Sequence, residues 1–221
     1  MLSLSYHNDE TVTEAGIDEA GRGPLFGRVY TACVILPNYS EFDFSEIKDS
    51  KKFTSQKKIR KVYDYIKEHA IAYSVTYREK EEIDRENILQ ATIQSMHNAI
   101  QQLPVIPDKI LVDGNYFKPY AYFDTNAGKL RQIPHICVKG GDNTYASIAA
   151  ASILCKVERD EYIQELCQRY AFLDEYYGLS KNKGYGTKKH MDGIREYGIT
   201  QWHRLSFAPC QNKPLIENEN N

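Results

Sequence analysis

The chain has 221 residues, of which 42% are hydrophobic, and a net charge of −2. This length is typical of one domain, with or without a small appendage. Because the net charge is close to zero, the protein as a whole has no strong electrostatic field that would attract it to nucleic acid or membranes. The five cysteines are widely spaced and contain no Cys-x-x-Cys pair, which argues against a disulfide framework or a zinc cluster and indicates a reducing compartment. The first 14 residues lack the features of a signal peptide, and the apolar runs are too short to span a bilayer, so we expect a cytoplasmic protein without a membrane segment.

The apolar patterns predict strands that alternate with helices along the chain. Strands are expected over 28–36, 71–77, 109–113 and 133–138, and helices over 55–69, 79–103, 144–169 and 188–196. Such alternation indicates an α/β layer architecture. Residues 16–18 and 28–36 are close enough in sequence to pair as a hairpin, so the sheet is predicted to be mixed. The helix over 55–69 should bury residues that recur with a helical period, namely Ile59, Val62, Tyr63 and Ile66.

Two adjacent acids, Asp18 and Glu19, stand in the glycine-rich stretch Gly-Ile-Asp-Glu-Ala-Gly-Arg-Gly-Pro-Leu-Phe-Gly, residues 16–27. Side chains of a strand alternate between its faces. Both acids can therefore serve one site only if the strand ends or bends there, which the glycines permit. Pro24 has a fixed φ and no N–H donor, so the segment after the acids is predicted to be a shaped loop. A solvated acidic hairpin turn would explain this stretch equally well.

Two further acids stand at positions where a metal site is possible. Asp113 ends the short apolar strand over 109–113, where α/β sites tend to lie, although a turn or helix cap is the commoner role. Asp160 continues an apolar stripe of the helix over 144–169, and a salt bridge with Lys156 or Arg159 would explain it equally well. A carboxylate cluster without histidine or cysteine suits Mg²⁺ or Mn²⁺ and two-metal phosphoryl transfer.

Basic and aromatic residues gather in the segment over 51–61 and towards the C-terminus. The basic runs over 51–61 and 181–204, the second of which includes Arg204, are either solvated helix faces or the borders of a polyanion groove. We interpret the aromatic residues of the C-terminal part as core residues and its two histidines as hydrogen-bonded structural groups. These residues are Tyr176, Tyr177, Trp202, His190 and His203.

The sequence resembles ribonuclease HII, the type 2 ribonuclease H. Five blocks in the order of that family carry the resemblance, and they extend from residue 16 to about residue 209. They are Gly16–Pro24, Asp49–Lys52, Val112–Gly114, Ser147–Asp160, and Asn182–Thr187 with His190 and His203–Phe207. The Gly-Arg-Gly tripeptide is similar to type HII rather than to the sister type HIII. The stretch Gly140–Asp142 is one residue longer than the family pattern, which leaves the role of Lys139 open.

The resemblance implies a ribonuclease H-like catalytic domain over 1–172, a mixed sheet flanked by helices, with a C-terminal helical extension and polar tail over 173–221. It implies that four carboxylates are catalytic and bind two divalent ions, Mg²⁺ or Mn²⁺: Asp18, Glu19, Asp113 and Asp160. The backbone of Gly21, Arg22 and Gly23 would read the 2′-hydroxyl of a ribonucleotide. Tyr185 would hold that nucleotide and pack on the next deoxyribose, and Lys51 would position a phosphate.

The implied activity is endonucleolytic hydrolysis of the RNA strand of RNA/DNA hybrids. The family also cuts on the 5′ side of single ribonucleotides embedded in duplex DNA, leaving 5′-phosphate and 3′-hydroxyl ends. The implied role is removal of misincorporated ribonucleotides during DNA repair by a monomer, and the sequence leaves a clamp or polymerase partner open. Two alternatives remain: another nuclease or recombinase of the same superfold, and a non-catalytic duplex-binding module.

Overall fold

The computed structural model describes residues 2–6, 11–37 and 43–216; the end of the predicted polar tail, 217–221, lies outside them. The chain divides into two compact units. The first comprises 1–20, 31–76 and 93–157, and the second comprises 21–30, 77–92 and 158–221. Both units are therefore assembled from separate stretches of sequence. The predicted boundary after residue 172 stays a prediction.

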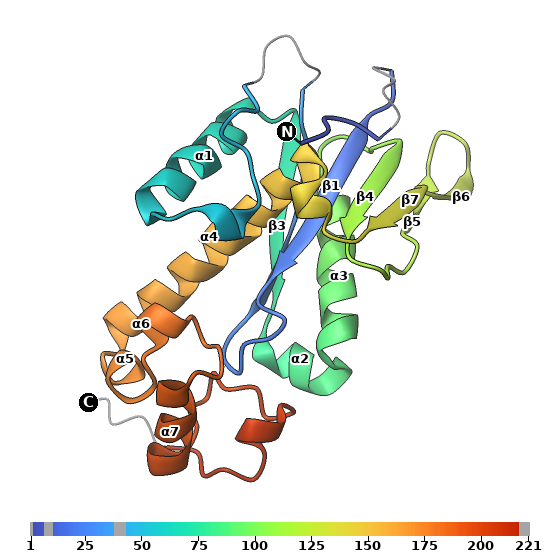
Figure 1. Ribbon diagram of the computed structural model, residues 1–221. Coiled ribbons are helices and arrows are strands. Elements are labelled where there is room, and N and C mark those ends of the chain that lie inside the picture. The colour runs from blue at the N-terminus through green and yellow to red at the C-terminus, as the bar shows by residue number, and fades with distance from the viewer. Residues whose placement is uncertain (1, 7–10, 38–42, 217–221) are drawn as a thin grey trace. The chain divides into compact units, whose positions relative to one another are not determined.

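A five-stranded sheet forms the centre of the first unit, in the order β3-β2-β1-β4-β7 (Figure 1). The strands are β1 (Glu14–Ala20), β2 (Val29–Ile35), β3 (Ala72–Arg78), β4 (Lys109–Asp113) and β7 (His135–Val138). β1 pairs with β4 in parallel, and β4 pairs with β7 in parallel. β1 and β2 are neighbours, as the sequence predicts, and the sheet as a whole is mixed.

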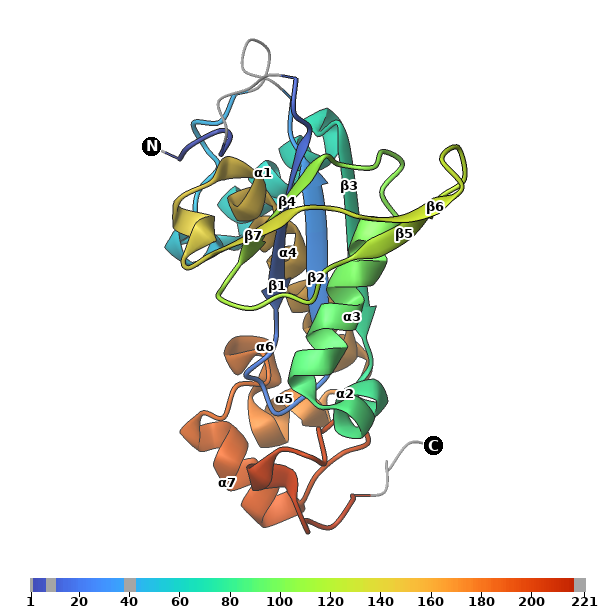
Figure 2. The same ribbon diagram turned by 90° about the vertical axis from the view of Figure 1, so that its right-hand side faces the viewer.

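Helices cover both faces of this sheet (Figures 1 and 2). α1 (Gln56–His69) and α4 (Ala146–Arg169) lie on one face, and α3 (Ile88–Gln101) lies on the other. Gly16 of β1 packs so closely on α4 that a Cβ atom there would meet the backbone of Ser147 and Ile148. Ala15 and Ile17 point to the opposite face, into a core cluster with residues of α3. Because faces alternate along a strand, Asp18 points to the α4 face.

The helix patterns of the sequence are confirmed in one place and wrong in another. The four apolar positions predicted for α1 are all buried. The single helix predicted over 79–103 is instead two helices, α2 (Lys80–Glu86) and α3. Between them Asn87 adopts a φ of 71°, and its Oδ1 atom accepts hydrogen bonds from the N–H groups of Leu89 and Gln90 at 3.0 and 3.1 Å. Asn87 therefore ends one helix and caps the next.

A second, two-stranded antiparallel sheet, formed by β5 (Ala121–Asp124) and β6 (Lys129–Gln132), is absent from the sequence-based prediction. Its register pairs Phe123 with Leu130, and these side chains are 59% and 73% exposed. A strand is recognised in sequence by one buried face. Because β6 is fully exposed and β5 is only partly buried on one face, where Tyr122 packs against the core cluster, the sequence carries only a weak signal of this kind.

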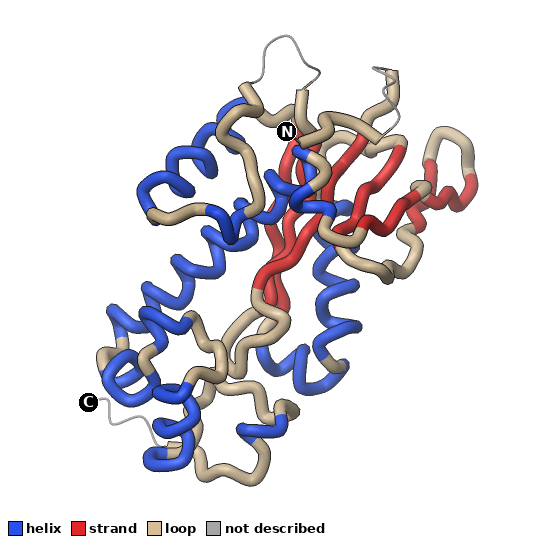
Figure 3. Tube along the Cα trace, in the orientation of Figure 1, coloured by secondary structure: helices blue, strands red, loops and turns tan. Residues whose placement is uncertain are grey.

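The second unit consists mainly of helices and loops (Figure 3). Besides α2 and the end of α4 it contains α5 (Phe172–Tyr177), α6 (Leu179–Asn182), α7 (Lys188–Tyr197) and a 3₁₀ turn over Ala208–Cys210. Its core includes Tyr177, with Tyr176 and Trp202 packed against it, which confirms the interpretation of these aromatics as core residues. All five cysteines are free. No helix in the described part of the chain is both long and apolar enough to cross a membrane.

Candidate active site

Asp18 and Asp113 lie side by side at the carboxyl ends of two parallel strands. The register of β1 and β4 pairs Ile17 with Val112, so the next residues in the two strands, Asp18 and Asp113, stand at the same level. Glu19 follows directly on β1. In α/β proteins this edge of the sheet is where ligands bind. The first unit therefore brings two of the four predicted carboxylates together, Asp18 and Asp113, and the charge of Glu19 also acts on Asp18.

Like charges and burial dominate the electrostatics of this edge. Asp18 is only 5% exposed, and its pKa is raised well above the usual value by burial and then by the negative charges of Glu19 and Asp113. Hydrogen bonds from the Ser152 hydroxyl and from the Glu19 N–H, at 2.7 Å, partly offset these effects. The pKa of Asp113 is also raised, mainly by burial. Bringing these carboxylates together is therefore costly without a cation.

The segment Asp49–Lys52 is joined to Asp18 through serine hydroxyls. Ser50 and Ser152 are both buried, and their Oγ atoms are 3.0 Å apart. Since the Ser152 hydroxyl donates to Asp18, it accepts from Ser50 in this pair. The sequence analysis assigned no role to either serine, because nothing in the sequence indicates that the two segments meet.

A second set of contacts orients Asp113. The N–H of Gly141 donates to Asp113 Oδ1 at 2.6 Å. The adjacent Asp142 is buried, and its carboxylate lies 3.4 Å from Lys51 Nζ. Although partial burial acts in the opposite direction, Asp142 raises the pKa of Lys51 through its charge and hydrogen bond. The stretch Gly140–Asp142 thus orients the carboxylate of Asp113. Lys51 places a positive charge next to Asp142 at this edge of the sheet.

The donor set fits hard divalent cations. Asp18, Glu19 and Asp113 carry carboxylate oxygens, the ligands that Mg²⁺ and Mn²⁺ prefer. A bound cation would offset the burial and the like charges that raise the pKa of Asp18. No group of three or more His, Cys, Asp or Glu in the described ranges is already arranged to hold a metal ion. Asp160 is buried, as its apolar stripe predicts, and belongs to the second unit.

The second unit brings the Gly-Arg-Gly loop together with Tyr185. Gly21 has a φ of 95°, and a Cβ atom there would meet the side chain of Arg159, so only glycine fits. Arg22 and Gly23 are exposed. A Cβ atom on Gly23 would stand 3.4 Å from the ring of Tyr185, which is itself 51% exposed. The loop backbone and a half-exposed aromatic ring thus form one surface.

Arg204 corrects the interpretation of the second basic run. The sequence analysis counted it among the residues of a solvated face or a polyanion groove, yet it is 0% exposed. Its guanidinium donates hydrogen bonds to carbonyl oxygens of the loop over residues 21–28. Arg159, also buried, donates to the carbonyls of Phe26 and Arg28, each at 3.3 Å. The basic run around Arg204 in the sequence does not indicate that this arginine is buried.

The two buried histidines of the second unit hydrogen-bond to each other, which confirms their interpretation as structural groups. His190 Nε2 and His203 Nε2 are 3.0 Å apart. On the far side of the pair, the N–H of Thr200 lies 2.9 Å from His203 Nδ1. On the near side, His190 Nδ1 lies 3.0 Å from the carbonyl oxygen of Tyr185. The pair therefore supports the backbone of Tyr185.

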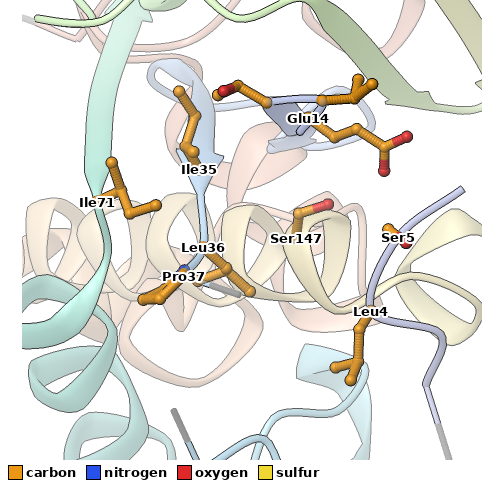
Figure 4. A pocket seen from close by; sticks show the side chains of 10 residues that line it. Leu4, Ser5, Glu14, Ile35, Leu36, Pro37, Ile71 and Ser147 are labelled. Atoms are coloured by element: carbon orange, nitrogen blue, oxygen red, sulfur yellow. The ribbon is translucent and has the colours of Figure 1, made fainter. Parts of the chain in front are cut away.

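A small pocket of the first unit lies at the other end of β1 from Asp18 (Figure 4). Its lining includes Glu14, Ile35, Pro37 and Ser147. Two buried polar atoms, Glu14 Oε1 and Ser147 Oγ, have no hydrogen-bond partner among the described residues. The pocket contains none of the carboxylates described above, so it is separate from the candidate site.

Comparison with known proteins agrees with this geometry. The family model described as ribonuclease HII matches residues 15–210. Ribonuclease HII of Phocaeicola vulgatus is 42% identical over 216 residues, which cover 98% of each chain, and that of Parabacteroides distasonis is 47% identical over 195 residues, 88% of this chain and 89% of its own. The crystal structure of ribonuclease H2 from Pyrococcus horikoshii OT3 superimposes with a TM-score of 0.70 at 24% identity, covering 90% of this chain and 95% of that one, which confirms the predicted fold. This chain belongs to the ribonuclease HII family.

Proposed function

We propose that this protein hydrolyses the RNA strand of RNA/DNA hybrids and cuts on the 5′ side of single ribonucleotides embedded in duplex DNA. The observation that carries the proposal is the level placement of Asp18 and Asp113 at the ends of adjacent parallel strands. Burial first, and nearby negative charges second, raise the pKa values of both carboxyl groups. Membership of the ribonuclease HII family supports endonucleolytic hydrolysis of RNA/DNA hybrids. The proposed products carry 5′-phosphate and 3′-hydroxyl ends.

The proposed cofactor is a pair of Mg²⁺ or Mn²⁺ ions held by Asp18, Glu19 and Asp113, with Asp160 as the fourth carboxylate. When bound, such ions activate the attacking water and stabilise the departing 3′-oxygen. The protein's own contribution is orientation. The Ser152 hydroxyl fixes Asp18, and the Gly141 N–H fixes Asp113. Preorganised ligands of this kind lower the cost of bringing like charges together.

Selection of the ribonucleotide is proposed to fall to the loop over Gly21–Gly23 and to Tyr185. The 2′-hydroxyl is the group that distinguishes RNA from DNA, and it both donates and accepts hydrogen bonds. Backbone groups of an exposed glycine loop can reach it, and the Tyr185 ring stands beside Gly23, where it can pack on the next deoxyribose. Lys51 is proposed as a phosphate contact, which adds affinity without reading sequence.

The decisive experiment is cleavage of an end-labelled DNA duplex that contains one ribonucleotide, in the presence of Mg²⁺. We expect a single cut on the 5′ side of the ribonucleotide, and its loss in Asp113→Asn. The matched control is Asp64→Asn, because Asp64 is an exposed aspartate of α1 whose only described ion pair is with Arg60. This control should cut like the unmodified protein.

The same assay separates the alternatives. Another nuclease or recombinase of this superfold would cut hybrids or DNA but show no preference for the single ribonucleotide. A non-catalytic duplex-binding module would bind the duplex in a salt-dependent way and leave it intact. Absence of any cut with either Mg²⁺ or Mn²⁺ would overturn the proposed function. We further propose that the protein acts as a cytoplasmic monomer, which sedimentation of the purified chain would test.

A further inference from the structure

The guanidinium of Arg204 makes five hydrogen bonds to a single loop. Its nitrogens donate to the carbonyl oxygens of Gly21 at 2.6 Å, Arg22 at 3.1 Å, Pro24 at 2.8 Å, Gly27 at 2.9 Å and Arg28 at 3.1 Å. A guanidinium has five N–H donors in a fixed plane, so the count of donors equals the count of acceptors. The side chain is fully buried among these carbonyls.

A charge in this position needs an explanation, because burial of an arginine is costly. Burial, and then the charge of Arg159, lower the pKa of Arg204 to about 9. The nearby carboxylate of Asp84 acts in the opposite direction, but its oxygens accept hydrogen bonds from the N–H groups of Leu205 and Ser206 and from the Ser206 hydroxyl. Packing a core would be simpler with an apolar residue. A buried arginine at this position is explained if the protein needs the five carbonyl groups of the loop to be held in fixed directions.

The direction of a carbonyl fixes the direction of the next N–H group. In a planar trans peptide the C=O of one residue and the N–H of the next point to opposite sides. The carbonyls of Gly21 and Arg22 point to the buried guanidinium, so the N–H groups of Arg22 and Gly23 point away from it. Both of these residues are exposed, and Gly23 adjoins the ring of Tyr185.

We propose that Arg204 is a positioning residue for ribonucleotide recognition: it turns the Gly21 and Arg22 carbonyls inward and thereby presents the Arg22 and Gly23 N–H groups, beside Tyr185, to the 2′-hydroxyl. This inference rests on the proposed function, in which the glycine loop reads that hydroxyl. Arg204 itself does not touch the substrate. A lysine has three donors around a point charge and cannot satisfy five carbonyls in one plane, so it would not hold the loop in this form.

The test compares the affinity of the protein for two duplexes, one with a single ribonucleotide and one of DNA alone, by fluorescence anisotropy in Mg²⁺. Asp113→Asn serves as the parent, since it is expected to bind without cutting. We expect the parent to prefer the ribonucleotide duplex, and Arg204→Lys in the same background to lose about tenfold of that preference. The affinity for DNA alone should change little. The matched control is Arg195→Lys, because Arg195 is an exposed arginine of α7 that pairs with Asp192; it should keep the preference.

A ratio of two affinities is insensitive to the folded fraction, so a purely structural defect would not change it. Should Arg204→Lys fail to fold, Asp84→Asn provides the second variant, because it disturbs only the carboxylate that anchors the backbone after Arg204. It should lose part of the preference. In Arg204→Ala, added guanidinium ion should restore the preference and methylammonium should not.

The outcomes separate the inference from the function on which it rests. An unchanged preference in folded Arg204→Lys and in Asp84→Asn would overturn the positioning role of Arg204 and leave the proposed function intact. Equal affinity of the parent for the two duplexes would overturn the reading of the 2′-hydroxyl by this loop, and the inference with it.

Discussion

The Nε2 atoms of His190 and His203 lie 3.0 Å apart in the core of the second unit, and a single backbone donor determines the protonation of both rings. The N–H of Thr200 can only donate, so His203 Nδ1 accepts and its Nε2 carries the proton. His203 Nε2–H donates to His190 Nε2, which accepts. The proton of His190 is therefore on Nδ1, which donates to the Tyr185 carbonyl oxygen. Both rings are therefore neutral in the folded protein.

Neutral buried histidines make the stability depend on pH. Burial lowers the pKa of His203 to about 3 and lowers that of His190 as well. Because the folded pKa values lie below the unfolded ones, the stabilisation is present above about pH 6.5 and is lost as the pH falls from there towards 3. At about pH 5.5 the loss from His203 should be on the order of 1 kcal/mol, and His190 should add to it in the same direction. Urea unfolding midpoints between about pH 7.5 and 5 measure it.

Two variants distinguish the effect of the buried histidines on the pH dependence of stability from the effect of the carboxyl groups. His203→Gln should be less stable than the unmodified protein at about pH 7.5 but should show a smaller fall in stability on acidification. His69→Gln, at a partly exposed position on α1, should keep the original pH dependence. The raised pKa values of Asp18 and Asp113 act in the opposite sense and are common to all three proteins. An identical slope in His203→Gln would show that the pair does not cause the effect.

Gly21→Ala should abolish most cleavage and destabilise the protein, because the residue has a φ of 95° and a Cβ atom would meet Arg159. The left-handed backbone costs about 1 kcal/mol and the steric overlap about 1–3 kcal/mol more. Gly128→Ala is the matched control, since it also has a positive φ, 64°, but open space at its Cβ position. It should lose about 1 kcal/mol and retain full activity. Comparable losses in both variants would refute the steric argument.

Ser152→Ala should lower cleavage activity and raise the metal concentration needed for half-maximal rate, because it removes the hydroxyl that orients Asp18. The destabilisation should be about 1 kcal/mol. Ser147→Ala is the control on the same helix, because the Ser147 hydroxyl has no hydrogen-bond partner within the described part of the chain. Removal of an unsatisfied buried hydroxyl should leave activity unchanged and stability equal or higher. Metal titrations of both variants, with thermal melting, check the pair.

Asn87 should be more tolerant of glycine than of alanine. Asn87→Ala loses the cap of α3 and places a Cβ-bearing residue at a φ of 71°, so we expect a loss of about 2 kcal/mol. Asn87→Gly loses only the cap, for which about a few tenths of a kcal/mol is expected. Urea unfolding at neutral pH distinguishes them. Equal losses would mean that the backbone angle does not determine the choice of residue here.

The sequence best predicts structural features that are determined by residues close together along the chain. The helical period of Ile59, Val62, Tyr63 and Ile66 identifies α1 and its buried face, and both are confirmed. The same periodicity runs through Asn87 without interruption, so it predicts one helix where the cap produces two. A pattern of apolar spacing does not register a single residue that ends a helix.

What the sequence predicts poorly depends on residues that meet from distant segments. The sequence blocks around Asp18 and Asp113 predict a site. They do not reveal that the Gly141 N–H binds the Asp113 carboxylate or that the Ser152 hydroxyl binds that of Asp18. Arg204 is the clearest case, since its neighbours in sequence suggest a solvated basic run and its five partners lie near the other end of the chain. Burial of a charge is a property of the fold, and composition does not reveal it.

The separation of Arg204 from its loop has a consequence for synthesis of the protein. The bond from Arg204 to Gly21 joins residues 183 positions apart, so a growing chain carries the glycine loop for most of translation without the side chain that orders it. Long-range closures of this kind come late in folding. The emerging chain would hold Asp18, Glu19 and Asp113 early, whereas the loop that we propose to recognise ribose would be ordered only once nearly all of the chain has left the ribosome. An incomplete chain would therefore lack the selectivity that we propose for the finished enzyme.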